Sequence, residues 1–177
     1  RPYWREGAYQ DALDFAPDKV IIKLGTNDIK PKNWRLKAQI EEDLKALVES
    51  FEQLPSSPQV YLSYPVPIQA SKWGMKERTL TQGLMPKIKT VATQLKLPII
   101  DFHGAVPAKA KYFSDGIHPN AAGAKLMAEA VVKALKIKVK KQKRIFNTAI
   151  IPVPKLENDF YNWEERHAAI LKMLEKE

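Results

Sequence analysis

Short apolar runs and longer amphipathic stretches alternate along the first 135 residues of the chain. Three runs, at residues 20–24, 60–63 and 97–101, have the length of buried strands, and the first is almost entirely apolar. A strand that is apolar on both faces is typical of a parallel sheet with helices on both sides. The pattern therefore predicts a parallel sheet built from these three segments.

Helical periodicity separates the three runs. Apolar residues recur every three or four positions over residues 40–54 and 77–95, and again from about 121 to 135. A shorter helix is expected over Tyr9–Phe15 and a loop over residues 25–34. Pro86 predicts a kink or a restart in the second long helix, and Asn120 is placed to cap the third. Strands that alternate with helices in this order predict an α/β fold, a three-layer α/β/α sandwich with a parallel sheet.

Two polar segments are expected at the edge of this sheet where ligands bind, beyond the carboxyl ends of the strands. Gly25-Thr26-Asn27-Asp28 follows the first strand, and Asp115-Gly116-Ile117-His118-Pro119 precedes the last helix. The Asn27 amide is suited to donate to an oxyanion. His118 is suited to accept a proton, with Asp115 three residues earlier to orient the ring. Taken singly, Asn27 is better explained as an ordinary turn residue, and an Asp-x-x-His spacing alone is weak evidence of a site.

Together the two segments resemble two sequence blocks of the SGNH (GDSL-type) hydrolase family. The resemblance covers about residues 1–135, and the blocks are residues 21–28 and 115–123. It implies a flavodoxin-like sandwich and hydrolysis of carboxylic esters through an acyl-serine intermediate, with no cofactor. It makes Asn27 an oxyanion donor, His118 the general base and Asp115 its partner, while Gly25 and Asp28 support the oxyanion loop.

Two loops look most like the sialate O-acetylesterase-like, carbohydrate-directed branch of that family. They are residues 30–34 and 64–67. This likeness implies removal of acetyl groups from carbohydrate esters, and family resemblance alone favours a secreted or periplasmic location. Trp34 and Trp73 are candidates to stack on a sugar, although ordinary loop packing explains them equally well. The side chains expected to contact substrate are Asn33, Trp34, Tyr64, Val66 and Trp73.

The family's nucleophile has no counterpart in this sequence. The family places its serine in a Gly-Asp-Ser turn near the amino terminus and an oxyanion glycine in the next block, and neither occurs here. We therefore expect an amino-terminal strand and helix to be missing and this chain alone to have little or no esterase activity. The serines present, all outside such a turn, are Ser50, Ser56, Ser57, Ser63, Ser71 and Ser114.

The sequence suggests three parts along the chain. Residues 1–137 are expected to form the hydrolase domain, residues 138–158 a basic linker that contains proline, and residues 159–177 a helix. Residues 156–167 look like the lead-in helix before the serine strand in tandem members of the family. A second SGNH unit in a longer chain is one interpretation of this tail, and a plain terminal helix packed on the domain is the other.

Composition removes some classes of function. The chain has 177 residues, a net charge of +9 and a pI of about 9.6. Much of this charge lies in residues 133–144, without a nucleic-acid-binding motif, so we expect a solvated helix end rather than a nucleic-acid partner. No run approaches the roughly 20 apolar residues of a membrane-spanning helix. The absence of cysteine excludes disulfides and a cysteine nucleophile.

Besides nucleic-acid binding, the least favoured, two alternatives to the serine esterase remain open from the sequence. A metal-dependent hydrolase would use Asp101, His103, Asp115 and His118 as ligands of one divalent ion. A carbohydrate-binding or scaffold domain would keep the fold and lack the nucleophile.

Overall fold

The computed structural model describes residues 3–138. Its sheet has three parallel strands in the order β1-β2-β3, with Val20 opposite Val60 and Leu62 opposite Ile99. The predicted parallel sheet is confirmed, with neighbouring strands adjacent in the sequence. The strands are β1 (Lys19–Ile22), β2 (Gln59–Tyr64) and β3 (Ile99–Asp101).

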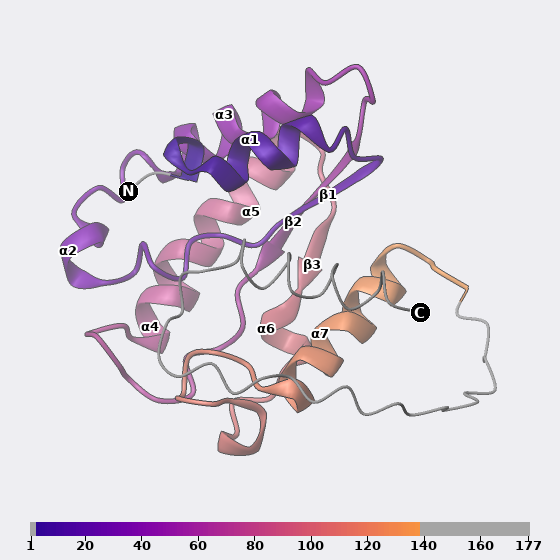
Figure 1. Ribbon diagram of the computed structural model, residues 1–177. Helices are drawn as coiled ribbons and strands as arrows, with labels where there is room; N and C mark the ends of the chain where they lie inside the picture. The colour runs from indigo at the N-terminus through magenta and orange to yellow at the C-terminus, as the bar shows by residue number, and fades with distance from the viewer. Residues whose placement is uncertain (1–2, 139–177) are drawn as a thin grey trace, which may run out of the picture. The chain divides into compact units, whose positions relative to one another are not determined.

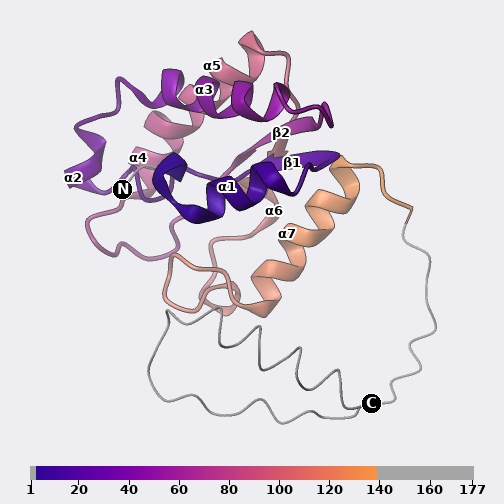
Figure 2. The ribbon, with the colours of Figure 1, turned by 45° about the horizontal axis from the view of Figure 1, so that its top comes forward.

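Helices cover both faces of the sheet (Figure 1). The helices α3 (Ile40–Glu52) and α5 (Met85–Gln94) pack on one face, and α7 (Ala121–Ala134) packs on the other. Figure 2 shows the same layers from a turned view, with α1 (Gly7–Asp14) alongside β1. The predicted three-layer α/β/α sandwich is confirmed.

Side chains of the strands belong to two separate hydrophobic cores, one on each face of the sheet. Val60 and Leu62 of β2 join Ile22 in the core beneath α3 and α5, whereas Tyr61 joins Ile100 in the core beneath α7. This division follows from the alternation of side chains along a strand. Helices cover both faces of the sheet, so side chains that point to either face are buried. This is why apolar residues follow one another along the strands instead of alternating with polar ones.

Proline sets the boundaries of two helical segments. The helix predicted over residues 77–95 is instead α4 (Glu77–Thr79), a π-helical segment η2 (Leu80–Leu84) and α5. Pro86, in the first turn of α5, has no N–H for the carbonyl four residues earlier, so a regular α-helix cannot run through it. The loop predicted over residues 25–34 contains a short helix, α2 (Pro31–Trp34), which begins at its proline as helices commonly do.

The remaining short elements complete the described part of the chain. Within residues 3–138, no helix is both long enough and apolar enough to cross a membrane. The predicted linker, apart from residue 138, and the predicted terminal helix lie outside the described residues. The short elements are η1 (Tyr3–Arg5), α6 (Phe102–Ala105) and η3 (Ala110–Tyr112).

Asn120 caps α7, as predicted, and also ties the preceding loop together. Its Oδ1 accepts the backbone N–H groups of Ala122 and Gly123 at 3.0 and 3.2 Å, and its Nδ2 donates to the Lys111 carbonyl at 2.9 Å. We predict that Asn120→Ala lowers the free energy of unfolding by about 1–2 kcal/mol, because two helix N–H groups lose their acceptor. Urea denaturation followed by circular dichroism measures this change.

Asn120→Asp is the matched control, because a carboxylate keeps the acceptor at the helix N-terminus and loses only the donor to Lys111. We expect it to retain most of the wild-type stability. Equal losses in the two variants would mean that the tie to Lys111, rather than the cap, stabilises this region.

Candidate active site

Three loops meet at the carboxyl ends of the strands. They are residues 23–30 after β1, 65–76 after β2, and 106–120 between α6 and α7. The N–H groups of Gln69 and Ala70 both donate to the Gly116 carbonyl, at 2.9 and 3.2 Å, and so join the second loop to the third. Gly116 has a φ of +86°, and a Cβ there would lie 2.5 Å from that of Ala70, so this close approach requires glycine.

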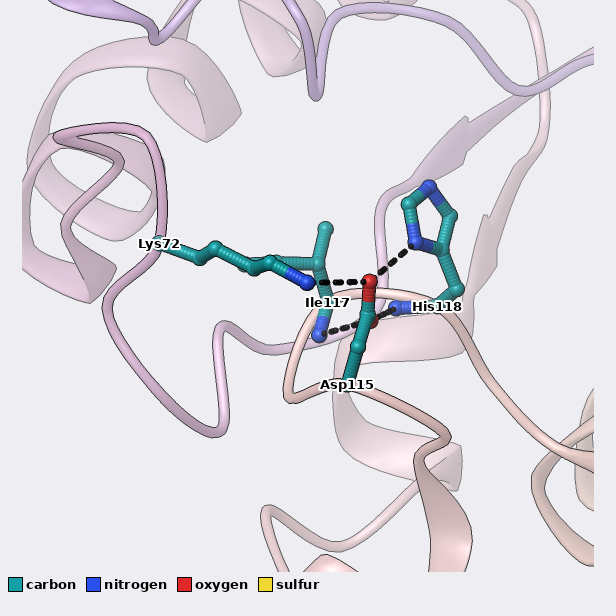
Figure 3. Close-up of polar contacts among 4 residues, drawn as sticks. All are labelled: Lys72, Asp115, Ile117 and His118. Carbon is teal, nitrogen blue, oxygen red and sulfur yellow. Dashed lines mark hydrogen bonds and ion pairs between the residues drawn. The ribbon is translucent and has the colours of Figure 1, made fainter.

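Asp115 and His118 form a hydrogen-bonded pair on the third loop (Figure 3). Asp115 Oδ2 lies 2.9 Å from His118 Nδ1, and the other oxygen, Oδ1, accepts the backbone N–H groups of Ile117 and His118 at 3.0 and 2.8 Å. Lys72 Nζ, from the second loop, lies 3.2 Å from Oδ2. The carboxylate is therefore held in one orientation from several sides.

These contacts keep Asp115 ionised. The backbone N–H of His118, its imidazole and the backbone N–H of Ile117 hold the pKa of Asp115 well below its usual range, with a smaller contribution from Lys72. An ionised Asp115 favours the tautomer with the proton on Nδ1 of His118, which leaves Nε2 as a proton acceptor. The imidazole is 66% exposed, and its Nε2 points away from the carboxylate. A general base needs this arrangement.

Asn27 lies exposed in the loop that follows β1. Its backbone carbonyl accepts the Asn33 side-chain amide at 2.9 Å and the Lys30 N–H at 3.3 Å. Within the described residues its own side-chain amide makes no hydrogen bond, so the amide is available to an outside acceptor. Asn33, predicted to contact substrate, therefore braces the loop through Asn27.

Gly25 allows this loop to leave β1 at a sharp angle. It has a φ of +105°, and a Cβ there would lie 2.7 Å from a methyl group of Leu84. The Gly25 carbonyl accepts the Asp28 N–H at 2.9 Å, which closes a tight turn around Asn27. Desolvation raises the pKa of the Asp28 carboxyl above its ordinary value, partly offset by a backbone hydrogen bond.

Trp73 lies between the Asn27 loop and the His118 loop. Its ring centre is 6.0 Å from that of His118 and 5.2 Å from Lys30 Nζ. The next residue, Gly74, is so close to Pro31 that a Cβ would lie 2.8 Å from the proline ring. The structure thus brings both predicted segments to the same edge of the sheet, although no hydrogen bond joins Asn27 to His118 within residues 3–138.

The other predicted substrate contacts have different surroundings. Trp34 packs over Gly83 of η2, where a Cβ would lie 2.5 Å from the indole ring. Tyr64 is partly buried at the end of β2. Val66 requires a correction: it is 1% exposed and belongs to the core beneath α7, because the chain after β2 first turns inward. Of the aromatic candidates, Trp73 is the exposed one beside His118.

The four residues considered as metal ligands are divided among separate contacts. Asp101 caps the short helix α6, and His103 Nε2 lies 2.6 Å from Glu77 Oε1. Asp115 and His118 contact each other instead. Within residues 3–138, no group of three or more histidine, cysteine or acidic side chains is placed to hold a metal ion.

Two residues that hold the site were missed by the sequence analysis, Lys72 and Glu77. Glu77 Oε2 accepts the Ile68 N–H at 2.7 Å, and its Oε1 contacts His103, so it fastens the second loop to α6. Neither residue belongs to a recognisable motif. For Lys72 the sole signal in the sequence is its position next to Trp73.

Among the described residues, no serine hydroxyl donates to His118. Ser63 donates to the Ile22 carbonyl within the sheet at 3.0 Å, and Ser71 donates to the Met75 carbonyl at 2.9 Å. The described site thus has the features of a general base and a candidate oxyanion donor, without a nucleophile.

Comparison with known proteins shows where this arrangement belongs. Residues 1–126 match the GDSL-like lipase/acylhydrolase family. The chain belongs to this family. It is 36% identical over 153 residues to an acetylxylan esterase from Xylanibacter ruminicola, a match that covers 76% of this chain and 32% of the relative. It is 30% identical over 118 residues to a multidomain esterase from Ruminococcus flavefaciens, with 65% and 15% covered.

Solved structures show the same fold as this GDSL-family chain. The crystal structure of an acetylxylan esterase from Geobacillus stearothermophilus superposes with a TM-score of 0.58 at 22% identity, covering 75% of this chain and 66% of that one. The GDSL-family chain spans about a third of the length of the first curated relative and 15% of the second.

The lowered pKa of Asp115 leads to a stability prediction for this GDSL-family chain. A carboxyl whose pKa is lower in the folded state stabilises the fold above its unfolded pKa of about 3.9, and this contribution is lost as the pH falls towards the folded value. We predict that wild type is more stable than Asp115→Asn at pH 7, and that the difference narrows below about pH 4. Urea midpoints at a series of pH values test this.

Asp18→Asn serves as the control, because Asp18 is exposed and its side chain makes no hydrogen bond within the described residues. It should follow wild type at each pH. A difference between wild type and Asp115→Asn that stays constant from pH 7 to pH 3 would contradict the prediction.

Proposed function

We propose that this chain supplies the general base and an oxyanion donor of a carboxylic ester hydrolase that removes acetyl groups from carbohydrates. The observation that carries the proposal is the pair in which Asp115 Oδ2 lies 2.9 Å from His118 Nδ1, with Nε2 of an exposed imidazole free to accept a proton. Family membership supports ester hydrolysis, and the likeness to an acetylxylan esterase supports acetyl as the acyl group.

Each residue has a defined role in the proposed reaction. His118 Nε2 takes the proton of a serine hydroxyl as its oxygen attacks the ester carbonyl, and Asp115 stabilises the imidazolium that forms. The Asn27 amide donates to the developing oxyanion. The proton then passes to the sugar oxygen, which leaves as a hydroxyl. Water, activated by the same imidazole, hydrolyses the acyl-serine and releases acetate.

The proposal places the serine on a strand outside these 177 residues, paired with the free edge of β1. Within the described residues β1 pairs with β2 alone. A cavity of about 660 Å³ lies along β1, lined largely by apolar residues of β1 and its surroundings, among them Phe15, just after α1, and Phe51 of α3. Exposed strand edges are usually paired or covered, so this edge and cavity suit an added parallel strand. Its carboxyl end would lie at the edge that holds Asn27.

The narrower forms of the proposal concern the sugar and the length of the protein. Trp73, 52% exposed beside His118, is suited to pack against a sugar ring, as expected for a carbohydrate-directed or sialate O-acetylesterase-like enzyme. A second hydrolase unit in a longer protein fits the multidomain esterase relative, of which this chain covers 15%.

A non-catalytic carbohydrate-binding domain is the second candidate function, favoured by the lack of a serine contact to His118 in the described residues.

Hydrolysis of p-nitrophenyl acetate tests the esterase proposal. We expect this chain alone to be inactive and the longer protein to be active, with the activity abolished by a serine-directed phosphonate. In the longer protein, His118→Ala should lower kcat by roughly 10³–10⁶-fold, because the serine loses its base. Inactivity of both proteins would favour the binding domain. Activity that resists the phosphonate but is lost with a chelator would indicate a metal-dependent enzyme.

The role of Asn27 has its own test in the longer protein. Asn27→Ala should lower kcat by about 10²–10³-fold with little change in KM, because the lost hydrogen bond forms in the transition state. Asn27→Asp keeps the size of the side chain and places a negative charge by the oxyanion, so its loss should be at least as large. Unchanged turnover in Asn27→Ala would remove the residue from the mechanism.

A further inference from the structure

Trp73 is an exposed aromatic residue with cations on its ring. The Nζ atoms of Lys72 and Lys30 lie 4.6 and 5.2 Å from the centre of the indole, within the range of cation–π attraction. The ring of His118 lies 6.0 Å away. An aromatic surface and positive charge therefore lie together beside the proposed general base.

The backbone of Trp73 is held in an unfavourable conformation. Its φ is +53°, in the left-handed region that a bulky L-residue rarely adopts, and Gly74 follows at +73°. A glycine would adopt this φ without strain, and an indole that is 52% exposed gains less from burial than a core residue. Strain of this kind concentrates at ligand-binding positions.

The two lysines differ in what balances their charge. Lys72 Nζ is paired with Asp115 Oδ2 at 3.2 Å, so its charge is already balanced by the carboxylate of the loop that carries His118. Lys30 Nζ contacts the Trp73 ring and has no carboxylate partner within residues 3–138. The cluster thus offers one ammonium group that can pair with an anion from outside.

We propose that Lys30 and Trp73 form a subsite for a negatively charged sugar, so that the preferred ester is an acetylated saccharide with an anionic substituent. This inference rests on the proposed function. The sugar ring packs on the indole, the anionic group pairs with Lys30, and the acetyl ester then lies beside His118. A lysine ammonium acts as a point charge and does not select the planar shape of a carboxylate. The shared chemistry is therefore the anion, from either a uronate or a sulfated sugar.

Binding of saccharides without ester groups tests the subsite apart from any esterase activity. The indole N–H signal of Trp73, assigned by comparison with Trp73→Phe, is followed by NMR in this chain. The titrants are a glucuronate-bearing xylo-oligosaccharide, a sulfated one and a neutral one of the same length. We expect the acidic sugars to bind roughly two- to fivefold more tightly, a difference that shrinks in high salt. Equal affinity for neutral and acidic sugars would overturn the proposal.

Two lysines provide a matched pair of variants. Lys30→Met should reduce the affinity for the acidic sugars to that for the neutral one, whereas Lys32→Met, an exposed lysine two residues away, should leave both affinities unchanged. Lys30 immediately precedes α2 and Lys32 lies within it, so each variant removes one positive charge from the same segment. Equal losses in the two variants would show general charge attraction and would overturn the specific role of Lys30.

Trp73→Gly separates binding from folding. We expect the affinity for all three saccharides to fall, while the urea midpoint is not lowered, because glycine relieves the strain at φ +53°. A lower midpoint with unchanged affinity would assign Trp73 to the fold and overturn the subsite.

Kinetic measurements on the longer protein test the subsite a second time, and this test requires esterase activity. Lys30→Met should raise KM for the acidic acetylated saccharide about two- to fivefold and leave kcat for it unchanged. If the esterase proposal is wrong, the longer protein will be inactive towards p-nitrophenyl acetate. The NMR titration, which needs no esterase activity, still tests whether Lys30 and Trp73 bind an acidic sugar.

Discussion

The arrangement of the site depends on one carboxylate, that of Asp115. It accepts hydrogen bonds from two backbone N–H groups of its own loop, from the imidazole of His118 and from Lys72 on the neighbouring loop. The backbone contacts set the shape of the turn, and the imidazole contact sets the tautomer of His118, the proposed base. Because both are made by the same group, the loop cannot move without disturbing the imidazole of His118, and the proposed chemistry is coupled to the local fold.

The sheet determines where this loop lies, and glycine determines how closely the loops approach. Parallel strands present their carboxyl ends at one edge, so the loops after β1 and β2 lie close to the loop before α7. Gly116 lies against Ala70, and Gly74 lies against Pro31, at distances that a Cβ would not permit. Trp73 is thereby positioned between Lys30, in the loop after β1, and His118. Asn27 and His118, far apart in the sequence, are thus placed by contacts between their loops and not by a hydrogen bond between their own side chains.

Much of this could be predicted from the sequence, because periodicity reports burial and motifs report local turns. The strands, the main helices, the cap at Asn120 and the pairing of Asp115 with His118 all depend on residues close together in the chain. Val66 was misassigned, because a residue just after a strand can turn either towards solvent or into the core. Lys72 and Glu77 were missed, because each contacts a partner in another segment of the chain and ordinary surface positions carry the same residue types.

The exposure of the base has a consequence for the proposed mechanism. Hydrogen bonds to a developing oxyanion stabilise it far more where water is excluded, because the local dielectric constant is then lower. The imidazole of His118 is 66% exposed, and Asn27 is exposed as well, so water reaches both in the described part of the chain. Two proposed components would cover them, a strand on the free edge of β1 and a sugar ring against Trp73. The proposed base and its aspartate are oriented in advance, while the low-dielectric surroundings would form when these components are present. Packing of the sugar on Trp73 would then contribute to kcat by excluding water, whereas the ion pair with Lys30, made equally in the ground state and the transition state, would contribute to KM alone.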